Sequence, residues 1–118
     1  MFNFRFEDFE IWKMCINISN ELFDIADRAE NLKLYRFAEQ LRAAGMSITN
    51  NISEGSGSFS NKEFASFLNI ARRSIYECAN ILFIFEKRKI ITEEEKVKLF
   101  GQLKRASSSI ANFRKTLL

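Results

Sequence analysis

Basic side chains are the residues in this sequence best suited to bind a partner. Three adjacent pairs follow one another along the second half of the chain: Arg72–Arg73, Lys104–Arg105 and Arg114–Lys115. Guanidinium and ammonium groups bind phosphate oxygens, so together these pairs could form a basic stripe that contacts RNA or DNA. Such binding would rely on backbone contacts and shape, because the sequence has no base-reading motif. A single basic pair is more often only a solvated part of the surface.

The composition argues against catalysis and metal binding. The chain has no His, the commonest general base and metal ligand, and two Cys are too few for a structural zinc site. The string Gly55-Ser56-Gly57-Ser58 follows an expected helix and lacks the Lys-Ser/Thr ending of a phosphate-binding loop, so we interpret it as a turn. We therefore expect a non-enzymatic protein with no catalytic residue, no metal site and no cofactor.

A polar motif ends the stretch from Gln40 to Gly57. Asn51 lies beside an apolar helical stripe, and Glu54 and Gly55 follow where the helix is expected to stop. Unpaired polar groups in such a place would cost about 1–3 kcal/mol each. We expect Asn51 and Glu54 to form hydrogen bonds that tie this helix end to its neighbours. Gly45 costs about 1 kcal/mol in a helix interior, which indicates a packing role.

Four segments carry apolar residues at alternating steps of three and four, which is typical of helices that pack nearly parallel. The first two run from about Phe6 to Ala29 and from Phe37 to Glu54. Capping boxes at 60–63 and 92–95 predict the starts of the third and fourth, and the third is expected to end near Lys89. Short connections then predict an all-α, antiparallel up-down-up-down four-helix bundle over 1–118, in a single domain.

The length, the apolar pattern and the cysteines also predict where the protein is found. No basic segment followed by an apolar run opens the chain, and the longest apolar run, 81–85, is far too short to span a membrane. Cys15 and Cys78 both lie within apolar stripes, where free cysteines are usually buried. We expect a reduced, cytoplasmic protein with no membrane partner.

Charge is distributed unevenly along the chain. Residues 1–30 hold three basic and seven acidic side chains, a net charge of −4. Because the whole chain has a net charge of +3, residues 31–118 carry a net charge of +7. This asymmetry indicates either a nucleic-acid surface or pairing of the acidic first helix with the basic last helix. The first helix also has two adjacent apolar stripes. That width fits either a deeply buried helix or a helix that packs against another subunit in a homo-oligomer.

Several motifs resemble a known family. They are Gln40-Leu41-Arg42, Ser47-Ile48, 51–55 (Asn-Ile-Ser-Glu-Gly), 62–64 (Lys-Glu-Phe) and 70–72 (Ile-Ala-Arg). The chain resembles the four-helix-bundle family of 23S rRNA intervening-sequence proteins, which also includes the accessory variability determinant of diversity-generating retroelements. The resemblance implies a non-catalytic protein that assembles as a homopentameric ring. In this family, the retroelement member binds nucleic acid and a reverse transcriptase through a basic surface. The sequence departs from the family pattern at Ala43, Thr49 and Arg73.

Two functions follow as hypotheses. In the first, a nucleic-acid-associated accessory protein presents the three basic pairs to structured RNA, to DNA or to a nucleic-acid-bound enzyme. In the second, a protein-interaction scaffold uses its positive charge to pair with its own acidic first helix. The net charge of +7 outside residues 1–30 favours the nucleic-acid hypothesis. Ala43 weighs against it, because an Arg is frequent at this position in the family.

Overall fold

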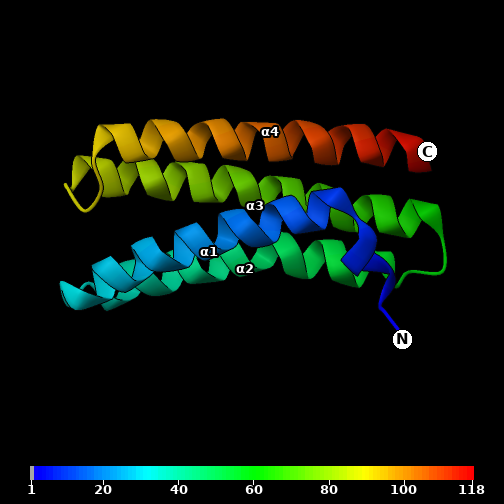
Figure 1. Cartoon of the computed structure of the whole chain (residues 1–118), viewed down its shortest axis with the longest axis horizontal. Helices are drawn as coiled ribbons and strands as arrows, with labels where there is room; N and C mark the ends of the chain where they lie inside the picture. The colour runs from blue at the N-terminus through cyan, green and yellow to red at the C-terminus, as the bar shows by residue number, and fades with distance from the viewer. Residues whose placement is uncertain (1) are drawn as a thin grey trace.

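Four long helices make up most of the computed structural model, which describes residues 2–118 (Figure 1). A short 3-10 helix, η1 (Arg5–Asp8), precedes them. The helices are α1 (Glu10–Asn31), α2 (Tyr35–Ser56), α3 (Asn61–Lys87) and α4 (Glu93–Leu117). The predicted all-α four-helix architecture is therefore confirmed, with helix ends that differ from the expected ones by a few residues.

The helices run alternately up and down in an elongated bundle measuring 43 × 27 × 22 Å, with both termini at one end (Figure 1). Helix α2 packs against both α1 and α3, and α4 packs against α3 and, less extensively, against α1. Consecutive helices are therefore neighbours in space, as short connections require.

Both predicted capping residues begin a helix. The Ser60 hydroxyl accepts a hydrogen bond from the Glu63 backbone N–H at 3.1 Å, and the Thr92 hydroxyl accepts one from the Glu95 N–H at 3.1 Å. At α4 the Glu95 carboxylate also accepts from the Thr92 N–H at 2.9 Å, which completes the box. At α3 the structure shows only the serine half of the box.

Two lysines turn the chain where helices usually end in glycine. Lys33 follows α1 with φ 65°, and Lys89 follows α3 with φ 61°. After each, a backbone N–H bonds back across the last turn: Leu34 N to Ala29 O and Ile90 N to Phe85 O, both at 2.9 Å. This pattern satisfies the terminal carbonyls of both helices, in a conformation that disfavours any residue with a Cβ.

The core consists mainly of apolar side chains, and it contains the second apolar stripe of α1, while much of the first stripe is half-buried. Cys15, Ile18 and Leu22 of the second stripe are buried, and Trp12 and Phe23 of the first are half-buried. No residue of α1 is among the exposed large hydrophobic side chains of residues 2–118. The second stripe of α1 is therefore buried within the chain itself, and the expectation that α1 also packs against another subunit stays a prediction.

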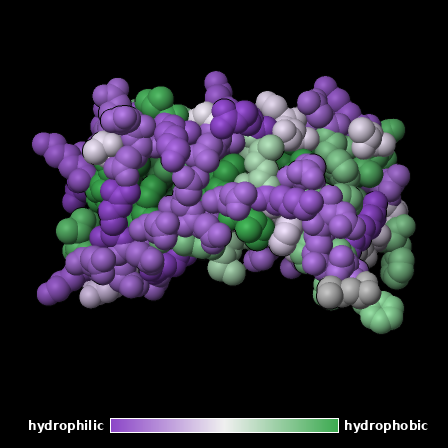
Figure 2. All heavy atoms as spheres, in the orientation of Figure 1, coloured by the Kyte–Doolittle hydropathy of each residue, from purple (hydrophilic) through white to green (hydrophobic). Residues whose placement is uncertain are grey.

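The exposed hydrophobic side chains lie elsewhere. Hydrophilic residues cover most of the face shown in Figure 2, with hydrophobic patches between them and at the end of the bundle that carries the N-terminal segment. Phe2 and Phe4 of that segment are exposed. Of the described helices, none is both long and apolar enough to cross a membrane.

Candidate nucleic-acid interface

The six predicted nucleic-acid contacts all lie on α3 and α4. Arg73, Lys104, Arg105 and Lys115 are exposed, whereas Arg72 and Arg114 are half-buried. Within residues 2–118, none of the six forms an ion pair with an acidic side chain. Their charge is therefore not neutralised by the fold.

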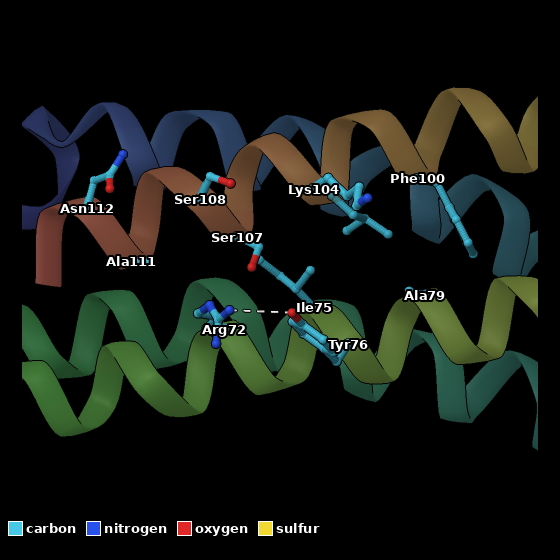
Figure 3. A pocket seen from close by; sticks show the side chains of 11 residues that line it. Arg72, Ile75, Tyr76, Ala79, Phe100, Lys104, Ser107, Ser108, Ala111 and Asn112 are labelled. Atoms are coloured by element: carbon cyan, nitrogen blue, oxygen red, sulfur yellow. Dashed lines mark hydrogen bonds between the residues drawn. The ribbon is translucent and has the colours of Figure 1, made fainter.

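A groove between α3 and α4 brings two of these cations together (Figure 3). Its volume is about 460 Å³, and Arg72 lines it from α3 while Lys104 lines it from α4. The apolar side chains of Ile75 and Leu103, both buried, form part of its lining. The other predicted cations are not among the lining residues, so the structure joins only one residue from each of two predicted pairs.

Arg72 lies against Tyr76, one helical turn further along α3 (Figure 3). Its guanidinium carbon is 5.3 Å from the centroid of the tyrosine ring, and Nη2 donates to the Tyr76 hydroxyl over a long 3.4 Å. The Nε atom of Arg72 is buried and has no hydrogen-bond partner. Because Nε is covered, the donors of Arg72 that can reach an anionic ligand are its terminal nitrogens, for which the structure shows only the long contact to Tyr76.

Arg114 has a structural contact that the sequence did not indicate. Its Nε donates to the backbone carbonyl of Ala65 at 3.0 Å, which links the last turns of α4 to the first turns of α3. Nearby, Phe113 packs against Phe64 and Phe9, with ring centroids 5.6 and 5.1 Å from its own. Arg114 therefore helps to hold the ends of the bundle together, and less of its guanidinium is free for a ligand.

Helix α1 uses its acidic residues at several places. Arg42 of α2 pairs with Asp27 at 2.6 Å and Glu30 at 3.0 Å. Glu21 forms an ion pair with Lys98 of α4 at 3.3 Å. In a second ion pair between these helices the charges are reversed, because the basic Arg28 of α1 pairs with the acidic Glu95 of α4. Within residues 2–118, the expected pairing of acidic α1 with basic α4 thus occurs at Lys98, which is outside the six candidate residues.

Gly55 allows α2 and α3 to approach closely where the turn joins them. A Cβ at this position would lie 2.6 Å from the Cβ of Phe67 and 2.9 Å from Cδ1 of Phe64. Gly45 has a similar role against α1, because its carbonyl accepts from the Ser19 hydroxyl at 2.9 Å and a Cβ would lie 3.3 Å from Phe23. The packing role predicted for Gly45 is confirmed.

Asn51 and Glu54 act differently from the prediction. The Asn51 amide donates within α2, to the Ser47 carbonyl at 2.7 Å and to the Ser47 hydroxyl at 3.1 Å. The Ser47 hydroxyl in turn lies 2.8 Å from that of Ser74 on α3, so Asn51 reaches its neighbour helix only through Ser47. Glu54 is exposed, and within residues 2–118 its side chain forms no hydrogen bond, so the prediction that Glu54 links this helix end to its neighbours is wrong.

The residue that sequence reasoning missed is Tyr76. Its position four residues after Arg72 places both on one face of a helix, which was the available signal. Its place beside the groove depends on how α4 is rotated against α3, and helical periodicity alone does not give that rotation.

The cysteines and carboxylates offer no reactive centre in the described part of the chain. Burial raises the pKa of both the Cys15 and Cys78 thiols to about 12, so neither forms a thiolate near neutral pH. Residues 2–118 contain no group of three or more Cys, Asp or Glu side chains placed to hold a metal ion. The groove between α3 and α4, with its cations and aromatic ring, is the arrangement best suited to binding.

Comparison with known proteins agrees with the motifs. The family model described as 23S rRNA-intervening sequence protein matches residues 7–112, which include α1, α2, α3 and most of α4. Among curated proteins, none matches the chain.

Proposed function

Since the chain belongs to the family of 23S rRNA-intervening sequence proteins, we propose that it is a non-enzymatic accessory protein that binds structured RNA or DNA. The family is not known as an enzyme family. The proposed contact surface is the basic face of α3 and α4, defined by Arg72, Arg73, Lys104, Arg105 and Lys115. Arg114 contributes less, because its Nε is engaged by Ala65.

The observation that carries this proposal is the absence of acidic partners for these cations within residues 2–118. A scaffold that uses up its positive charge internally would pair them with α1. Instead, the acidic residues of α1 pair with Lys13, Arg42 and Lys98 or remain solvated. Cations that the fold does not neutralise favour phosphate binding with release of counterions.

We further propose that the protein assembles as a homo-oligomer, for which the family resemblance implies a pentamer. The second apolar stripe of α1 does not support this assembly, because it is buried within the chain. Support comes instead from Ile70 and Ile84, which are exposed and lie two heptads apart on one face of α3, away from the groove. Light scattering at micromolar concentration should give a mass well above the 13.8 kDa of one chain; a monomer mass would contradict the proposal.

A salt titration of RNA binding tests the function. With about four to six phosphate contacts, log affinity should fall with log salt at a slope of roughly −3 to −5. Replacing Lys104 and Arg105 with Ala should make that slope shallower by about 1.5–2. The matched control replaces Lys13 and Arg36, on α1 and α2, which removes the same charge from a different part of the surface.

The two outcomes separate the hypotheses. A steep slope that flattens in the α4 variant and not in the control supports nucleic-acid binding by this face. Weak binding without salt dependence, in a protein that still assembles, would refute it and favour a protein-interaction scaffold.

A further inference from the structure

The groove between α3 and α4 combines an exposed aromatic ring with a cation on each wall (Figure 3). We propose that it is a site for an unpaired nucleotide, whose base stacks on Tyr76 and whose phosphates contact Arg72 and Lys104. This inference rests on the proposed function and adds the class of nucleic acid that the protein prefers: single strands, loops and bulges rather than continuous duplex.

Tyr76 has the properties of a stacking platform. Its side chain is 60% exposed although it borders a groove lined by Ile75, Ala79 and Phe100. The Arg72 guanidinium lies over the ring, 5.3 Å from its centroid, and forms a cation–π contact with it. Aromatic side chains stack on any nucleobase, because every base has a π-face, so this contact needs no base-reading motif.

The charges around the ring suit phosphate groups on either side of the bound base. In residues 2–118 neither Arg72 nor Lys104 forms an ion pair, and the terminal nitrogens of Arg72 make only the long contact to Tyr76. None of the residues that line the groove is acidic. The groove wall on α4 adds the hydroxyl of Ser108 and the amide of Asn112, groups able to hydrogen-bond a base edge or a ribose.

The size of the groove favours one unpaired base. Its volume of about 460 Å³ lies within the roughly 300–1,000 Å³ typical of small-ligand sites. In a duplex both faces of each base are covered by neighbouring pairs, so Tyr76 could stack only on a base extruded from the helix. Single-stranded loops, bulges and ends expose bases that are free to stack on aromatic side chains.

The experiment compares two RNA probes of equal length: a single strand without self-complementarity, and the same strand in a perfect duplex. Each is titrated with the wild-type protein and with Tyr76→Leu, Tyr76→Phe and Tyr35→Leu. Tyr35 is the matched control, because it is 56% exposed and begins α2, outside the groove. A 2-aminopurine base within the single strand reports stacking directly, by quenching of its fluorescence.

We expect the wild type to prefer the single strand and to quench the base analogue. Tyr76→Leu should weaken single-strand binding about 5- to 150-fold and abolish quenching. Duplex affinity and the salt slope should stay unchanged. Tyr76→Phe and Tyr35→Leu should behave as the wild type, and circular dichroism checks that each variant is folded.

Two results would overturn the inference. If the wild type shows no preference for the single strand, or if Tyr76→Leu keeps wild-type affinity and quenching while the salt dependence persists, the groove does not hold a base. The basic face could still bind nucleic acid in either case. Salt-independent, weak binding of both probes would instead remove the proposed function and this inference together.

Discussion

Gly55→Ala probes the close approach of α2 and α3. The added Cβ would lie 2.6 Å from the Cβ of Phe67, an atom fixed to the backbone of α3, so relief requires the helices to move apart. Overpacking of this kind costs about 1–3 kcal/mol, and we expect the upper end here. Alanine returns about 1 kcal/mol of helix propensity. The net prediction is a loss of about 2 kcal/mol in the free energy of unfolding.

Gly101→Ala is the control within the same protein. Gly101 lies inside α4, and the nearest atom to its added Cβ is the end of the flexible Arg105 side chain at 4.0 Å. With no clash to offset it, the gain in helix propensity should stabilise the protein by about 0.5–1 kcal/mol. The same substitution should therefore have opposite signs at the two positions.

Urea denaturation followed by circular dichroism measures both changes. All variants are compared at one protein concentration, because an oligomer couples assembly to stability. For a chain of this length, a loss of about 2 kcal/mol corresponds to a fall in Tm of about 6–12 °C. A Gly55→Ala variant as stable as the wild type would show that α2 and α3 pack less closely in solution than in the structure.

Two further predictions concern helix ends and pH. Lys33→Gly and Lys89→Gly should each raise the free energy of unfolding by about 0.5–1 kcal/mol, since glycine adopts the left-handed conformation without the Cβ penalty; denaturation midpoints that fall would contradict this. Hydrogen bonds from Arg28 and from the Thr92 backbone lower the pKa of Glu95 from its ordinary 4.5 to about 2. The stabilisation from Glu95 is therefore complete above pH 4.5 and is lost as the pH falls through about 2, and Arg28→Ala should reduce that loss. An NMR titration of the Glu95 carboxyl with a midpoint near 4.5 would show that the pair does not form.

The sequence predicted those features that local patterns control. Apolar residues spaced alternately three and four positions apart identified all four helices. Ser60 and Thr92 marked the starts of α3 and α4, because a side-chain cap depends only on nearby residues. Gly45 was recognised for a similar reason, since glycine is costly in a helix unless another element needs the space.

The features that were missed depend on how helices are rotated against each other. Periodicity shows that α1 has a wide apolar face, but it does not show which neighbours cover that face. Burial of α1 within one chain and contact of α1 with another subunit therefore predict the same sequence pattern. Arg114 was assigned to the basic surface because its acceptor, the Ala65 carbonyl, belongs to another helix. Glu54 was predicted to form hydrogen bonds to neighbouring helices because it follows the apolar stripe in sequence. In the structure its side chain is exposed at the end of α2.

The order of the helices in the bundle bears on how fast the chain folds. Among residues 2–118, the three most extensive interfaces join helices that are consecutive in sequence, whereas the smaller contacts of α1 with α4 and of η1 with α2 join segments far apart in the chain. Loop closure therefore costs little entropy for most of the native structure. Domains dominated by such local contacts fold in microseconds to milliseconds, so the isolated chain should reach its fold long before it meets further copies of itself.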